Sequence, residues 1–128
     1  MQYGFSKTVE HSFQTAKEKV TEALQNEGFG ILTTIDVKDT LKQKLNVDFQ
    51  NYVILGACNP LFAHRALQTE EEIGLLLPCN ILVYEKEGKT IVALFDPSVI
   101  KAISEKKELH SLADEVQQKL LRVFAALK

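Results

Sequence analysis

The sequence predicts an α+β fold, a two-layer sandwich of about five mainly antiparallel strands with two long amphipathic helices on one face and several short helices besides. Two apolar segments, 81–84 and 90–95, flank a Glu-Gly turn at 87–88, which is typical of a β-hairpin. Residues 13–27 and 109–127 each place their apolar side chains on one helical stripe. Helices of this kind suit packing on one face of a sheet.

The first 28 residues are expected to form a strand and then a helix. Apolar and polar side chains alternate over residues 2–10, which predicts a half-buried strand, although Lys7 interrupts its apolar face. Ser12 can cap the helix over 13–27 because its hydroxyl can accept a hydrogen bond from a free N–H of the first turn. Gly28 is well placed to end that helix.

The next segments are expected to form two strands separated by a short helix. Residues 29–35 are rich in β-branched side chains and predict a second strand. Asp36 can cap a short polar helix over 37–45. Alternate apolar positions then predict a third strand over 47–58, whose first half is irregular because Asn51 breaks the apolar set.

Two dipeptides that end in proline mark further helix starts. Asn59-Pro60 and Asp96-Pro97 each place an N-cap residue before a proline at the first helical position. We therefore expect short helices that end near residues 67 and 103. Residues 69–72, Thr-Glu-Glu-Glu, match a capping box and predict one more helical turn.

The composition is that of an ordinary soluble protein, with 45% hydrophobic and 25% charged residues and a formal net charge of −2. At 128 residues we expect a single domain over 1–128. No basic stripe with interleaved aromatics favours a nucleic-acid partner, and no run of about 18 apolar residues favours a membrane span. The first residues lack the pattern of a secretory signal, so we expect a cytoplasmic protein.

The only two cysteines lie in matched contexts, Cys58-Asn59-Pro60 and Pro78-Cys79-Asn80, where we expect any functional site. Cys58 lies where a strand ends and a helix begins, and the partial positive charge of a helix N-terminus lowers the pKa of a thiol. Cys58 is therefore a candidate nucleophile, redox centre or metal ligand. The alternative is that Cys58 is a small buried residue that closes its strand.

Other side chains near the cysteines are candidates with ordinary alternatives. His64 could act as a base for the thiol, or it could be a solvated histidine. Arg65 could hold a carboxylate or a phosphate, or it could pair with Glu70 or Glu71. Asn80 could bond the backbone of its own loop.

A disulfide between Cys58 and Cys79 is geometrically possible, but free thiols are expected in a reducing cytoplasm. A zinc site would need two more ligands, for which His64 and the glutamates at 70–72 are nearest, and no Cys-x-x-Cys spacing supports it. We therefore expect no metal and no cofactor.

With these segments placed, the chain resembles the family catalogued as domain of unknown function 302. The resemblance is carried by Gly28-Phe29-Gly30, Ile35-Asp36-Val37, and the segments 55–60, 63–67, 74–80 and 83–85. It covers nearly the whole chain. It implies a small bacterial or archaeal protein with one α+β domain and a homodimeric assembly. It marks the two Cys-Asn motifs but implies no catalytic role for any residue.

Three hypotheses for the function follow. In the first, a homodimer binds a small anionic or electrophilic molecule at Cys58, Asn59, Arg65, Cys79 and Asn80. In the second, a thiol enzyme or redox protein uses Cys58 to attack and Cys79 to resolve or assist. In the third, both motifs are structural turns. The hairpin strands are apolar on both faces, which favours a dimer because two long helices can cover only one face.

Overall fold

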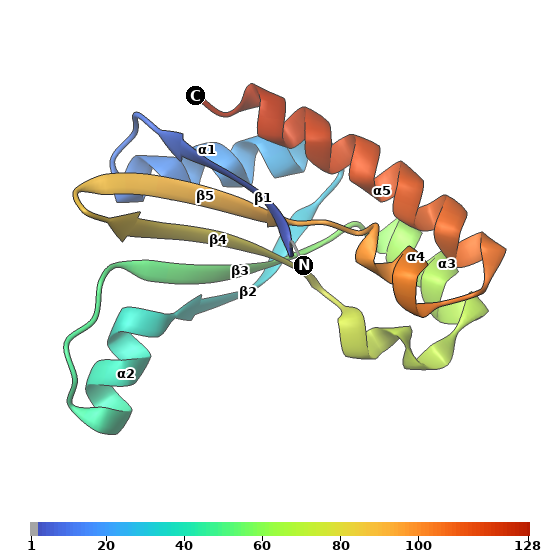
Figure 1. The fold of residues 1–128 in the computed structure, drawn as a ribbon, viewed down its shortest axis with the longest axis horizontal. Helices are drawn as coiled ribbons and strands as arrows, with labels where there is room; N and C mark the ends of the chain where they lie inside the picture. Colours follow the sequence, from blue (N-terminus) through green and yellow to red (C-terminus); the bar gives the residue numbers. More distant parts are fainter. Residues whose placement is uncertain (1–2) are drawn as a thin grey trace.

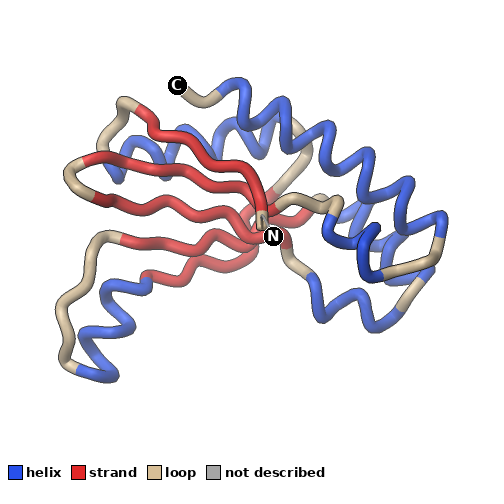
Figure 2. The backbone as a smooth tube through the Cα atoms, viewed as in Figure 1, coloured by secondary structure: helices blue, strands red, loops and turns tan. Residues whose placement is uncertain are grey.

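The computed structural model describes residues 3–128, whose strands form one antiparallel sheet in the order β1-β5-β4-β3-β2 (Figures 1 and 2). The strands are β1 (Gly4–Val9), β2 (Gly30–Asp36), β3 (Tyr52–Cys58), β4 (Cys79–Lys86) and β5 (Lys89–Phe95). The helices are α1 (Phe13–Asn26), α2 (Val37–Leu45), α3 (Pro60–Thr69), the 3-10 helix η1 (Glu71–Leu76), α4 (Val99–Ile103) and α5 (Lys107–Ala126). The predicted α+β fold class is confirmed. Residue 2, where the first strand was expected to begin, lies outside the described residues.

The β4–β5 hairpin lies in the interior of the sheet, as the sequence predicts. Glu87 and Gly88 both adopt positive φ angles, 54° and 77°, which suit the tight turn that matches the twist of paired strands. β4 pairs with β3 on one side and with β5 on the other, and β1 pairs with the free side of β5. The N-terminal strand therefore lies beside the last strand of the chain.

The long helices α1 and α5 cover one face of the sheet and bury the main core against it (Figure 1). Ser12 caps α1 as predicted, because its Oγ accepts a hydrogen bond from the Thr15 N–H at 3.2 Å. Gly28 follows α1 with a φ of +87°, a conformation that favours glycine. The largest fully buried side chains of this core are Leu24 and Val20 of α1, Ile81, Val83, Val92 and Leu94 of the hairpin, and Leu120 and Val123 of α5.

The charged residue that interrupts the apolar face of β1 joins two layers of the fold. Lys7 is half-buried, and its Nζ donates a hydrogen bond to the carbonyl of Leu127 at 2.9 Å. The same Nζ lies 4.3 Å from the centre of the Phe124 ring. Lys7 therefore connects β1 to the C-terminal end of α5.

Two local expectations are corrected. The third strand begins at Tyr52, and residues 46–51 form a connection outside the regular elements, so only the second half of the expected strand is regular. The capping box at 69–72 is wrong, because Thr69 is the last residue of α3 and its hydroxyl donates to the carbonyl of Arg65 at 3.0 Å. A threonine that bonds the carbonyl four residues back can remain within a helix. Accordingly, η1 starts later, without a side-chain cap.

The short helix α2 lies at the β2 edge of the sheet, away from α5 (Figure 1). Asp36 caps it as predicted, and its Oδ1 accepts a hydrogen bond from the Asp39 N–H at 2.9 Å. None of the residues of α2 is buried. Within residues 3–128, no helix is both long enough and apolar enough to span a bilayer.

Candidate functional site

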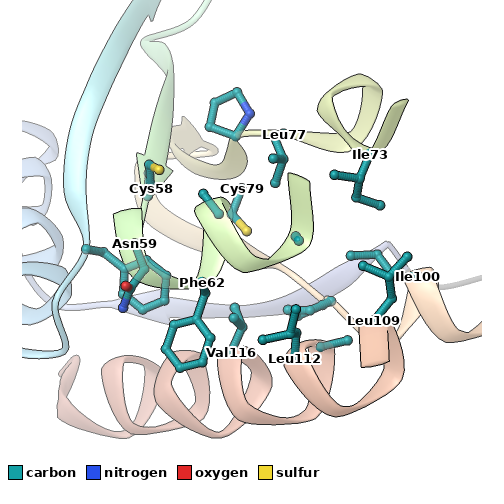
Figure 3. Close-up of a pocket in the computed structure, with 17 residues that line it drawn as sticks. Cys58, Asn59, Phe62, Ile73, Leu77, Cys79, Ile100, Leu109, Leu112 and Val116 are labelled. Carbon is teal, nitrogen blue, oxygen red and sulfur yellow. The ribbon is translucent and has the colours of Figure 1, made fainter. Parts of the chain in front are cut away.

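A small cavity of about 60 Å³ lies where the ends of β3 and β4 meet α3, η1 and the first half of α5 (Figure 3). Its wall is built mainly of apolar side chains, among them Phe62, Ile73, Leu77, Ile100, Leu112 and Val116. Cys58, Asn59 and Cys79 also line it. The cavity therefore borders both Cys-Asn motifs.

The two cysteines are neighbours in the sheet but point to different sides of it. Ala57 of β3 pairs with Cys79 of β4, and Ala57 is fully buried in the core. Because successive side chains of a strand alternate between faces, Cys79 points toward the helices, and Cys58 begins on the other side. Figure 3 shows the two sulfur atoms directed away from each other. Both residues are free thiols.

The surroundings of both thiols favour the protonated form. Burial raises the pKa of the Cys58 thiol. Burial and, to a smaller extent, the nearby Cys58 raise the pKa of Cys79 to about 11. The lowered pKa predicted for Cys58 is therefore wrong. Loss of water around the sulfur penalises the thiolate more than the partial charge at the start of α3 stabilises it.

Asn59 holds the loop that precedes the cavity. It occupies the N-cap position of α3 with an extended backbone, and Pro60 follows it, as the sequence predicts. However, its side chain makes no capping hydrogen bond, and its Nδ2 instead donates to the carbonyl of Glu27 at 3.4 Å. A Cβ on Gly28 would lie 3.0 Å from that Nδ2, so a glycine is required to let the two loops approach. Asn59 thus ties the start of α3 to the end of α1.

The other predicted site residues lie outside the cavity. His64 and Arg65 are exposed on α3 and do not line it, and the Arg65 guanidinium lies 6.0 Å from the centre of the Phe62 ring. Asn80 is exposed on the opposite face of the sheet, where it pairs with Gly56. The predicted set of five therefore divides, and only its cysteines and Asn59 meet at the cavity. No basic side chain lines the cavity to attract an anion.

The glutamates considered as metal ligands have another arrangement. Glu70 pairs with Lys106 at 2.7 Å instead of with Arg65, and the hydrogen bond from Lys106 lowers the pKa of the Glu70 carboxyl. Across residues 3–128, no three side chains of histidine, cysteine, aspartate or glutamate are grouped so that they could hold a metal ion.

Most of the cavity wall was not identified as a site from the sequence. Leu109, Leu112 and Val116 belong to the predicted apolar stripe of α5, but that stripe indicates only that they are buried. Ile73 and Leu77 come from the segment around η1, which carries no regular pattern. The one available signal was that the apolar stripe of α5 extends past the area that the sheet can cover.

Comparison with known proteins identifies relatives but no activity. The family described as "Domain of unknown function DUF302" matches residues 5–127. The crystal structure of an uncharacterized conserved protein DUF302 from Bacillus stearothermophilus superposes with a TM-score of 0.91 at 27% sequence identity, and the match covers 100% of both chains. No curated protein matches the sequence significantly.

Proposed function

Because this chain belongs to the DUF302 family, whose description names no activity, we propose its function from the cavity: the protein binds a small, uncharged, mainly apolar molecule beside the Cys79 thiol. The observation that supports this most directly is an apolar hollow of about 60 Å³ with a protonated thiol on its wall. Ligand sites are typically apolar with a few placed polar groups, and here the thiol and the Asn59 amide are those groups.

The size of the cavity limits the ligand. A cavity of 60 Å³ is about two water molecules in liquid volume, and it is less than half of an apolar cavity of ~150 Å³ that holds benzene. A molecule of a few heavy atoms fits this space. A charged group is disfavoured, because the wall offers it neither a basic side chain nor a carboxylate.

The thiol chemistry supports binding over catalysis. With a pKa of about 11, Cys79 is a thiolate in only about one molecule in 10⁴ at pH 7, and the thiolate is the nucleophilic form. The sulfurs also point apart, so Cys79 is not placed to resolve a bond formed on Cys58. A neutral thiol is polarizable and suits a soft, apolar ligand.

The remaining expectations form part of the same proposal. The protein is a single domain over residues 1–128, it is cytoplasmic, and it acts as a homodimer. Support for the dimer comes from the sheet, because α1 and α5 both lie on one face and leave the apolar hairpin residues of the other face uncovered (Figure 1).

The proposal can be tested by binding a probe of the right size. We expect dissolved xenon to cause saturable shifts in the methyl NMR signals of Leu112 and Val116, because apolar cavities of this kind bind xenon. Ala113 lines the cavity and is 3% exposed, so Ala113→Val adds two methyl groups into it and should abolish the shifts. Ala125→Val is the matched control, since Ala125 is an exposed residue of the same helix.

The natural ligand can be sought with the same variants. Gas chromatography with mass spectrometry of solvent extracts should find one small compound with the wild-type protein and with Ala125→Val, but not with Ala113→Val. Thermal unfolding checks that both variants are folded. Absence of saturable xenon binding to the wild type, or equal binding by Ala113→Val, would contradict the proposal.

A further inference from the structure

The face of the sheet opposite α1 and α5 is apolar at its centre and open. Residues on this face alternate with the core residues of each strand, so Tyr52, Leu82 and Tyr84 lie on it. Here the structure is hollowed to a volume of about 880 Å³, lined also by Tyr3, Phe49 and Phe95. We call this hollow the open face.

Aromatic side chains cross the open face in a row. The rings of Tyr52 and Tyr84 stack with centroids 5.3 Å apart, and Phe49 packs on Tyr52 at 6.1 Å. At the other end of the hollow, Tyr3 is 79% exposed. An apolar area of this extent on a soluble protein is typical of an interaction site.

Beside the open face lies a segment that has no core of its own. We call residues 37–51, which comprise α2 and the connection to β3, the α2 arm. The nine-residue helix α2 buries none of its residues, and isolated helices of this length are only marginally stable in water. The arm nevertheless exposes Leu45 at 66%, Val47 at 43% and Phe49 at 40%. The anchoring role predicted for Leu45 is therefore not fulfilled within one chain.

We propose that a second copy of this chain covers the open face, with the α2 arm of each subunit packed on the open face of the other. This inference rests on the homodimer within the proposed function and assigns its interface. One chain carries both an exposed apolar arm and an uncovered apolar face, and Phe49 belongs to both surfaces. A two-fold axis makes such a contact twice, because each arm then meets the face of the partner.

The exposed area matches what a stable dimer buries. At the exposures found, each large side chain of Tyr3, Ile35, Leu45, Val47 and Phe49 offers on the order of 100 Å². The half-buried residues of β3, β4 and β5 on the open face add to this area. The total approaches the ~800 Å² that each partner contributes to an interface of standard size.

The first test is a pair of matched leucine substitutions. Sedimentation equilibrium of the wild type should show a dimer at micromolar concentration. Leu45→Lys places a charge in both copies of the arm contact, and we expect it to weaken the dimer on the order of 100-fold. A lysine at the C-terminal end of α2 is electrostatically compatible with the helix, so folding is retained. Leu75→Lys is the control, because Leu75 is 84% exposed on η1, away from both surfaces.

The second test examines the reciprocal arrangement. Leu82→Lys alters the open face, and alone it should also give monomers. A mixture of Leu45→Lys with Leu82→Lys retains one intact arm-to-face contact, so heterodimers should form where neither variant dimerises alone. Circular dichroism verifies that each variant is folded, and Leu45→Lys still tests the interface if Leu82→Lys does not fold.

Each outcome separates this inference from the rest of the proposal. A monomeric wild type would overturn both the interface and the homodimer, while xenon binding in the cavity would remain as a separate result. A wild-type dimer that survives Leu45→Lys, or variants that fail to complement each other, would overturn only the reciprocal interface.

Discussion

Raising the pH through the titration of Cys79 tests the apolar character of the cavity. The pKa of this thiol is about 11 in the folded protein, against an ordinary value of 9.0. Between these two values, the unfolded chain has lost the proton and the folded chain retains it. Unfolding therefore releases a proton, so the free energy of unfolding is unaffected below about pH 9 and falls as the pH rises toward 11.

The size of the loss follows from the difference between the two pKa values. Each unit of difference corresponds to about 1.4 kcal/mol, so the full titration removes nearly 3 kcal/mol from the free energy of unfolding. That is a large share of the ~5–15 kcal/mol by which domains are stable. From pH 9 to pH 10.5, the expected loss is about 2 kcal/mol.

The assay is urea unfolding followed by circular dichroism at pH 8, 9, 10 and 10.5, for the wild type and for Cys79→Ala. Other groups titrate in the same range, including Tyr52, whose pKa is raised by burial and by Tyr84. Those contributions are common to both proteins and cancel in the difference. Removal of the sulfur shifts the stability of the variant by an amount that does not depend on pH.

Two results would refute this reasoning. One is a pH dependence of stability that is the same in the wild type and in Cys79→Ala. The other is alkylation of native Cys79 by iodoacetamide with an apparent pKa at or below ~8.5, the value of an unperturbed thiol. Either would mean that the sulfur is not held in an apolar environment.

Three further substitutions test the fold around the site. Lys7→Met should lower the free energy of unfolding in urea by about 1–2 kcal/mol, because the hydrogen bond to Leu127 and the contact with the Phe124 ring are lost; an unchanged value would show that neither contact stabilises the fold. Leu120→Ala should cost about 2–5 kcal/mol in the same assay, because Leu120 is fully buried, and a cost below 1 kcal/mol would contradict its place in the core. Asp36→Ala should speed amide exchange in α2 through loss of its cap, while global unfolding changes little because α2 lies outside the core; slower exchange, or a large global loss, would count against that arrangement.

The regular elements were predictable because local sequence determines them. The turn at Glu87-Gly88, the caps at Ser12 and Asp36 and the apolar stripe of α5 each depend on residues within a few positions of one another. The capping box at Thr69 failed because two local hydrogen bonds compete for one hydroxyl, and the helix bond was formed. A motif of four residues does not show which of the two is made.

The candidate site was predictable only in part. The matched Cys-Asn motifs pointed to the right end of the sheet, and strand alternation already required Cys79 and Asn80 to face opposite sides. Which of the two would face the helices depends on where α3 and α5 pack. The sequence likewise did not show that Arg65 and His64 point to solvent.

By itself, the sequence determined the α+β class, the central hairpin, the long helices and the pairing of the Cys-Asn motifs, because each is expressed in neighbouring residues. Only the tertiary structure decided that η1, α4 and α5 close an apolar cavity around Cys79, since its wall comes from segments far apart in the chain. That enclosure also set the direction of the thiol pKa values. A helix start favours the thiolate and burial disfavours it, and the packing of distant side chains determines which effect is larger.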